Sequence, residues 1–140
     1  MHVILGAGGA ISESLAHILS EKDIPVRQVA RHSRHYTYGT GMNADITKAE
    51  GAMKALDGAE VAYMVVGLPY KLSVWESTWP PMMQHIVNSC LQTGTKLVFL
   101  DNIYMLSDES MPNMTETSPM TPSSKKGIVR ANVDRIMLEA

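Results

Sequence analysis

The stretch that decides the fold is His-Val-Ile-Leu-Gly-Ala-Gly-Gly-Ala-Ile-Ser, at residues 2–12. Residues 3–5 are apolar and predict a short buried strand, and the glycines after them predict a turn. Apolar residues then recur at helical spacing and predict a helix over residues 10–21; they are Ile11, Leu15, Ile18 and Leu19. A strand, a glycine turn and a helix in this order present backbone N–H groups and a positive helix end to a phosphate. An ordinary strand-to-helix connection is the alternative.

The glycine spacing in this stretch is Gly6-x-x-Gly9-x-x-Ser12. Gly6 allows a tight turn after the strand, and Gly9 lets backbone approach a pyrophosphate because no Cβ stands in the way. The third position usually lets the helix pack close to the strand, and here it holds Ser12, which is small but is not glycine. We therefore expect a dinucleotide at this turn, bound by Gly6, Gly9, Ala10 and Ile11.

Length and composition narrow the class of protein. The 140 residues predict one domain, residues 1–140, and 45% apolar content predicts a globular core. A net charge of −2 gives no support to a nucleic-acid partner. No apolar run reaches transmembrane length and no signal peptide is evident, so we expect a soluble cytoplasmic protein with no membrane partner. Cys90 is the single cysteine, and we expect its thiol to be buried and unreactive. The spacing of the His and Cys residues does not match a metal site, so we expect none.

Further strands and helices alternate along the chain. Strands are expected at residues 25–30, 61–66 and 97–100, with at most a short strand ending near Ala44. Helices are expected at residues 48–56, at 75–93 and from 124 to the end, with a polar loop at 107–122. In the helix expected at residues 75–93, Pro80 and Pro81 indicate that the regular part begins at these prolines. This order predicts an α/β fold, a doubly wound parallel sheet with strand order 3-2-1-4-5.

The residues after the second strand bear on which dinucleotide binds. Sites for NAD usually carry an acidic residue there, which binds the ribose diol. This chain has none and instead carries Arg31 and Arg34, whose guanidinium groups can bind a 2′-phosphate. We expect NADP(H) rather than NAD(H), with a solvated basic loop as the alternative. The nicotinamide half is expected to pass Val66, Gly67 and Leu68, where the fourth strand ends.

Several motifs together resemble the extended short-chain dehydrogenase/reductase family, and in particular its atypical, epimerase-like members. The resemblance covers the whole chain. It rests on the glycine turn, on Gly67 after the fourth strand, and on five further segments: 44–47 (Ala-Asp-Ile-Thr), 75–83 (Trp-Glu…Trp-Pro-Pro-Met-Met), 101–105 (Asp-Asn-Ile-Tyr-Met), 115–119 (Thr-Glu-Thr-Ser-Pro) and 124–131. It implies a Rossmann-like nucleotide-binding fold. Family members are longer, so we expect the C-terminal part of the family fold to be absent and the chain, which ends inside a helical pattern, to be truncated.

The resemblance also implies positions for catalysis. Family enzymes carry a Tyr-x-x-x-Lys pair, in which the Tyr is the general acid/base, and a Ser or Thr after the fifth strand. The matching positions here are Lys126, Arg130 and Asn102, so the usual hydride-transfer mechanism is doubtful. Arg130 can still donate to a ribose, whereas Lys126 replaces a phenol poorly because it is protonated at neutral pH. A solvated helix face is the alternative for Lys126 and Arg130, and Tyr104 lies too close to the strand to replace the missing Tyr.

Asp45 resembles the family acid that contacts the adenine, and Ile46 would then supply an apolar wall. An N-cap for the helix that follows is a second role for Asp45 or Thr47.

Three functions are consistent with these features. The chain is an NADP(H)-binding module without turnover, an epimerase- or reductase-like enzyme that uses Asn102, Lys126 and Arg130, or a truncated form that folds with a partner. The resemblance also implies a homodimer through helices 75–93 and 124–140. Its contacts would come from Trp75, Trp79, Met82, Met83, Ile86, Val133 and Met137. Packing of these residues within their own chain is the alternative.

Overall fold

The computed structural model describes residues 1–32 and 35–140. Its elements are β1 (His2–Leu5), α1 (Ala10–Glu21), β2 (Val26–Ala30), β3 (Thr40–Asn43), α2 (Ala49–Leu56), β4 (Val61–Met64), α3 (Leu72–Thr93), β5 (Lys96–Phe99), the 3-10 turn η1 (Asp108–Ser110) and α4 (Lys125–Leu138). The chain forms two compact units. The first comprises Met1–Gly67 and His85–Leu100, and the second comprises Leu68–Gln84 and Asp101–Ala140.

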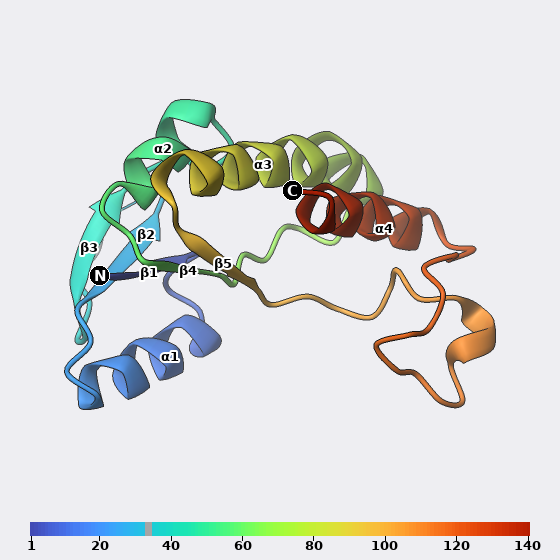
Figure 1. The fold of residues 1–140 in the computed structure, drawn as a ribbon, viewed down its shortest axis with the longest axis horizontal. Coiled ribbons are helices and arrows are strands. Elements are labelled where there is room, and N and C mark those ends of the chain that lie inside the picture. Colours follow the sequence, from blue (N-terminus) through green and yellow to red (C-terminus); the bar gives the residue numbers. More distant parts are fainter. Residues whose placement is uncertain (33–34) are drawn as a thin grey trace. The chain divides into compact units, whose positions relative to one another are not determined.

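The first unit is built on a parallel sheet of five strands in the order β3-β2-β1-β4-β5. This confirms the predicted order. Helix α1 covers one face of the sheet, and α2 with the His85–Thr93 part of α3 covers the other (Figure 1). Strand β1 lies at the centre and is covered on both faces, which is why Val3, Ile4 and Leu5 form an unbroken apolar run with no exposed surface.

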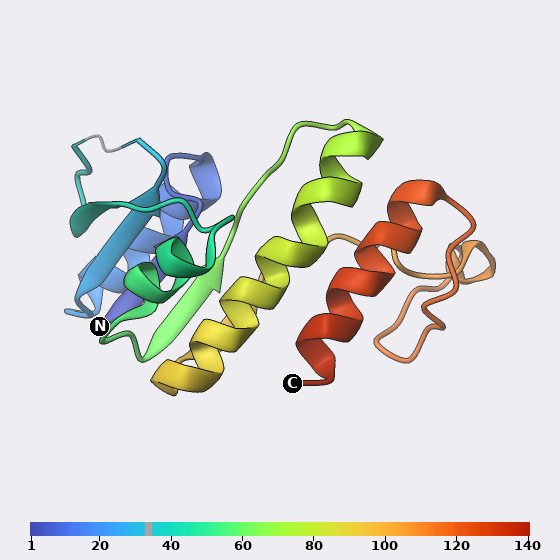
Figure 2. The same ribbon diagram turned by 90° about the horizontal axis from the view of Figure 1, so that it is seen from above.

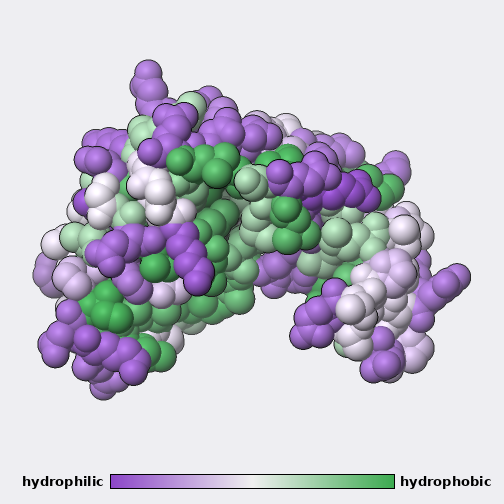
Figure 3. All heavy atoms as spheres, in the orientation of Figure 1, coloured by the Kyte–Doolittle hydropathy of each residue, from purple (hydrophilic) through white to green (hydrophobic). Residues whose placement is uncertain are grey.

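Helix α1 packs on the sheet through small residues. Ser12, Ala16 and Leu19 are buried, and Ala16 and Leu19 form a cluster with β-strand residues. Two of the apolar residues that predicted this helix, Ile11 and Ile18, are instead 56% and 48% exposed. The small side chains let the helix axis approach the strands, and the isoleucines lie on its outer side. Figure 3 shows the surface over α1 as mainly hydrophilic with apolar residues among the polar ones.

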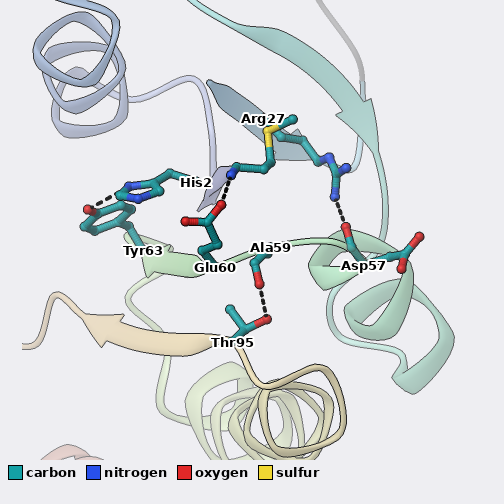
Figure 4. A network of polar contacts seen from close by, with 8 residues as sticks. His2, Arg27, Asp57, Ala59, Glu60, Tyr63 and Thr95 are labelled. Atoms are coloured by element: carbon teal, nitrogen blue, oxygen red, sulfur yellow. Dashed lines mark hydrogen bonds and ion pairs between the residues drawn. The ribbon is translucent and has the colours of Figure 1, made fainter. Parts of the chain in front are cut away.

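The edge where the strands begin is held by polar contacts (Figure 4). The amino group of Met1 is 2.7 Å from the carboxylate of Glu60, and the Thr95 hydroxyl donates to the Ala59 carbonyl at 2.9 Å. On the same edge, Nδ1 of His2 is 3.1 Å from the hydroxyl of Tyr63, and Arg27 donates to the carbonyl of Asp57 at 2.7 Å. The first two contacts join the segments that precede β1, β4 and β5, and the other two join β1 to β4 and β2 to the turn after α2.

Helix α3 differs from its prediction. It begins at Leu72 and continues through Pro80 and Pro81, so the expectation that its regular part begins at the prolines is wrong. A proline lacks an N–H and crowds the preceding turn, which disfavours a helix interior. The helix continues because the residues on both sides of the prolines are buried; they are Trp75 at 6%, Trp79 at 3%, Met82 at 1% and Met83 at 0% exposure.

Strand β4 ends at Met64 rather than at residue 66. The last sheet bond beside it joins the Val65 N–H to the Leu5 carbonyl at 3.0 Å, and β1 turns away at Gly6 directly afterwards. The pairing therefore stops where the glycine turn begins, and residues 65–67 extend along that turn.

The second unit contains the Leu72–Gln84 part of α3 and helix α4, which run side by side (Figure 2). Helix α4 begins one residue later than predicted because Ser124 is its N-cap, whose hydroxyl accepts from the Gly127 N–H at 3.0 Å. Among the described helices, none has the length and apolarity needed to cross a bilayer.

We predict that Gly6→Ala lowers the free energy of unfolding by about 2–4 kcal/mol, from backbone strain plus overpacking. Gly6 has φ +93°, and a Cβ there would lie 2.8 Å from the Cα of Val66. Gly58→Ala is the control, because Gly58 has φ +67° but open space around it. The loss of stability in this variant therefore measures backbone strain without a steric contact. Urea unfolding of both variants measures the difference, and equal losses would show that the contact with Val66 is unimportant.

Candidate functional site

Several of the predicted binding residues meet at one edge of the sheet. Because β1 to β4 are parallel, the residues that follow them lie along the same edge. These residues are Gly6 after β1, Arg31 after β2, Asp45 after β3, and Val66 with Gly67 after β4. Leu68 belongs to the second unit, and Arg34 lies outside the described residues.

The glycine turn is anchored on the neighbouring strand. The N–H groups of Gly6 and Ala7 both donate to the carbonyl of Val29 in β2, at 3.1 and 2.9 Å. Gly6 and Gly8 have φ values of +93° and +106°, which favour glycine. A Cβ at Gly9 would meet nothing within 4 Å, so the backbone at Gly9 faces open space. The turn therefore has a fixed base and an open side.

Ser12 closes the turn from the helix side. Its hydroxyl oxygen accepts from the N–H groups of Gly8 at 2.9 Å and Gly9 at 3.0 Å, and it donates to the carbonyl of Gly9 at 2.7 Å. Ser12 is only 1% exposed. The sequence indicated only that this residue is small, whereas its hydroxyl makes three hydrogen bonds. The signal in the sequence was a hydroxyl residue three positions after the N-cap, Gly9.

Amide groups remain for an anion in the first turn of α1. Gly9 is the N-cap of this helix, so the N–H groups of Ala10 and Ile11 have no partner within the helix. They lie at the positive end of the helix dipole. An anion at this end would be bound by these two amides, while Ser12 retains those of Gly8 and Gly9.

Asp45 makes its contacts within its own segment. Its Oδ1 accepts from the Thr47 hydroxyl at 2.7 Å and from the Thr47 N–H at 3.1 Å. These bonds, with the charges of Lys48 and Arg31, hold the pKa of the Asp45 carboxyl below its ordinary value. The N-cap of α2 is Lys48, so the expectation that Asp45 or Thr47 caps this helix is wrong. Asp45 instead closes the turn before the helix, and Ile46 beside it is buried at 8% exposure.

Arg31 directly follows β2 and is exposed. Ala30 and Asn43, the last residues of β2 and β3, are paired, so Arg31 and Asp45 follow the ends of neighbouring strands. The strand ends at Ala30, so no acidic residue stands where an NAD ribose is usually bound.

Arg130 in the second unit is buried. It is 1% exposed and forms an ion pair with Asp101, while its guanidinium carbon lies 4.4 Å from the centroid of the Trp79 ring. Burial lowers the pKa of Arg130, and the charge of Asp134 opposes this shift. The solvated-face alternative is therefore wrong for Arg130. The sequence did not indicate Asp101 as its partner because the two residues are far apart in the chain.

Lys126 lies against aromatic rings. Its Nζ is 3.2 Å from the centroid of the Tyr70 ring and donates to the Tyr70 carbonyl at 3.3 Å. The Tyr70 hydroxyl donates to the Tyr104 hydroxyl at 3.5 Å. This hydrogen bond raises the pKa of Tyr104, which favours the neutral phenol. The structure thus places two phenols near Lys126, although the sequence has no Tyr at the family position.

Asn102 makes its contacts in the segment after β5. Its Oδ1 accepts from the Tyr104 N–H at 2.9 Å, and its own N–H donates to Oδ1 of Asp101 at 2.7 Å. Asp101 therefore links Asn102 to Arg130. The roles expected for Asn102, Lys126 and Arg130 in catalysis stay predictions.

The remaining sequence expectations concern Cys90, metals and the dimer. Cys90 is buried at 7% exposure, and burial raises its pKa to about 11, in agreement with an inert thiol. Within residues 1–32 and 35–140, no three His, Cys, Asp or Glu side chains are grouped as metal ligands.

Most of the residues expected to form a dimer contact are buried inside the chain; they are Trp75, Trp79, Met82, Met83, Ile86 and Val133. These residues are not available to a second copy, and the homodimer stays a prediction.

Comparisons with solved structures show the fold. UDP-N-acetylglucosamine 4-epimerase from Bacillus cereus matches 98% of this chain with a TM-score of 0.79 and 15% identity, over 47% of its own length. The Bordetella bronchiseptica enzyme WbmG, in complex with NAD and UDP, matches 99% with a TM-score of 0.83 and 13% identity, over 49% of its length. A short-chain dehydrogenase/reductase superfamily protein from Agrobacterium tumefaciens with bound NAD matches 97% with a TM-score of 0.81 and 14% identity, over 43% of its length.

The chain therefore spans about half the length of the solved structures that it matches. No family model and no curated protein matches it. The predicted resemblance to epimerase-like short-chain dehydrogenases/reductases is confirmed as a likeness of fold, that of the N-terminal portion of these structures.

We predict that Ser12→Ala lowers the free energy of unfolding by roughly 1–3 kcal/mol, because the three hydrogen bonds of the Ser12 hydroxyl to the backbone of Gly8 and Gly9 are lost. Ser14→Ala on the exposed side of the same helix is the matched control and should change it by less than about 0.5 kcal/mol. Chemical denaturation measures both. Equal effects of the two substitutions would contradict the role of the Ser12 hydroxyl.

Proposed function

We propose that this chain binds a nicotinamide dinucleotide at the glycine turn, as the nucleotide-binding part of an epimerase- or reductase-like protein. The observation that carries the proposal is the turn itself. It leaves Gly9 open and presents the amides of Ala10 and Ile11 at the carboxyl edge of the central strand. The fold around it is shared with solved structures that contain NAD.

The chemistry of the edge indicates which residue contacts which part of the ligand. The pyrophosphate is negatively charged and suits the amides of the first helical turn. Asp45, whose pKa is lowered, is ionised at neutral pH and can accept from the amino group of an adenine, beside Ile46. The nicotinamide half then passes Val66, Gly67 and Leu68.

We extend the proposal to a preference for NADP(H). It is supported by Arg31, which is exposed directly after β2 where an acidic residue would otherwise select the ribose diol. Arg34 would contribute a second guanidinium. Two of the solved structures named above contain NAD, so a direct comparison of the two nucleotides decides this point.

Binding without turnover is the function that we favour. The amino group of Lys126 packs on the Tyr70 ring and donates to the Tyr70 carbonyl, so contacts within its own unit already engage it. Arg130 is ion-paired with Asp101 and packed on Trp79. The second candidate, turnover through Asn102, Lys126 and Arg130, is favoured only by the likeness to enzymes of known fold.

We predict that Gly9→Val lowers the affinity for NADPH and NADH roughly tenfold or more, because its side chain occupies the space of the pyrophosphate. The free energy of unfolding should fall by only about 1 kcal/mol, because Val is a poorer N-cap than Gly, while φ at Gly9 is −97° and no atom lies near its Cβ position. Ser14→Val adds similar bulk on the outer side of α1 and should leave binding intact. Fluorescence of the reduced nicotinamide measures affinity, and unaltered binding by Gly9→Val would refute the proposed site.

We predict that Arg31→Asp weakens NADPH binding about tenfold or more, by loss of a charge-assisted hydrogen bond, and strengthens NADH binding. Lys22→Asp makes the same change in charge after the far end of α1 and is the control. Titration with each nucleotide measures both affinities. If Arg31→Asp leaves their ratio unchanged, Arg31 does not contact the 2′-phosphate.

A further inference from the structure

A cavity of about 610 Å³ lies within the second unit. It is formed by the segment after β5, by residues 114–120 and by the last turn of α4. Four of its lining residues are methionines: Met105, Met114, Met120 and Met137. Thioether side chains are apolar and flexible, so such a wall can adapt to apolar groups of different shape.

The polar groups of this cavity carry an excess of negative charge. Asp134 lines it and is only 3% exposed, yet its Oδ1 has no hydrogen-bond partner in the described part of the chain. The other lining carboxylates are Asp101, which is ion-paired with Arg130, and Glu116, which is exposed. Three of the residues that line the cavity therefore carry carboxylates, and none of the described residues that line it is a lysine or an arginine.

A buried carboxylate oxygen without a hydrogen-bond donor is unfavourable, because it has lost water and gained no donor in return. Asp134 shows the expected effect: burial raises its pKa, and the charge of Arg130 only partly opposes this. A ligand that brings both a donor and a positive charge would remove the imbalance. A neutral alcohol would supply only the donor, and a carboxylate would add to the repulsion.

We propose that this cavity binds a small amphiphilic amine, with its ammonium on Asp134 and its apolar body against the methionines. The lining residues all belong to the second unit, and the glycine turn belongs to the first. The inference is therefore independent of dinucleotide binding.

The test uses the whole chain with methyl-¹³C methionine and three probes of equal length: n-hexylamine, 1-hexanol and hexanoate. The NMR signals of the eleven methionines are assigned by single Met→Leu variants. We expect hexylamine to shift the signals of the four lining methionines with an affinity roughly tenfold above that of hexanol, the size of one charge-assisted hydrogen bond. Met111, which is 69% exposed and does not line the cavity, should not shift.

Two variants separate the charge from the apolar wall. Asp134→Asn should remove the advantage of hexylamine over hexanol, whereas Glu109→Gln, at an exposed residue outside the cavity, should preserve it. Met120→Trp fills the cavity from a partly exposed position and should abolish the binding of both probes, which keeps the test decisive if Asp134→Asn does not fold.

Equal affinities for hexylamine and hexanol would overturn the proposal, as would shifts of Met111 as large as those of the lining methionines. Binding that survives Met120→Trp would also overturn it. Each measurement is repeated with saturating NADPH. A chain that binds hexylamine but no dinucleotide would refute the proposed function and leave this inference intact.

Discussion

The close approach of two backbones at Gly6 and Val66 is the constraint on which the first unit depends. Strand β1 is covered on both faces and must leave the sheet at once after Leu5, since a helix begins five residues later. The exit passes so near Val66 that a Cβ at Gly6 would lie 2.8 Å from its Cα. Only a residue without a side chain allows this, and the same turn places the start of α1 at the edge where the other strands also end.

Much of the first unit could be predicted because its signals are local. Val3, Ile4 and Leu5 form a continuous apolar run, and such a run predicts a strand buried on both faces. Glycines such as Gly6 and Gly67 follow the strands and separate the elements. Right-handed crossover connections between parallel strands then favour one strand order. What the sequence did not indicate was the side of α1 that packs on the sheet. Ile11 and Ile18 are more apolar than Ser12 and Ala16, so the apolar pattern pointed to the isoleucines as the buried side. Close packing of the helix on the sheet instead favours the smaller residues.

The site in the second unit was harder to predict because its contacts join residues distant in sequence. The ion pair between Arg130 and Asp101 and the contact between Lys126 and Tyr70 depend on how loops return to α4. No spacing rule indicates such contacts. The prolines of α3 were misleading for a similar reason, since the burial of Trp79 and Met82 outweighs a local preference that is otherwise reliable. The position of Ser12 was visible, but its three hydrogen bonds required knowledge of the turn geometry.

The hydroxyl of Ser12 has a consequence for the energetics of recognition. Many phosphate-binding loops are ordered by the anion that they bind, and the cost of ordering then reduces affinity. In this chain the Ser12 hydroxyl accepts from the inner amides of the turn, and these hydrogen bonds hold the shape of its backbone. If this turn binds an anion as we propose, the anion would meet a preorganised backbone, and little conformational entropy would be lost on association.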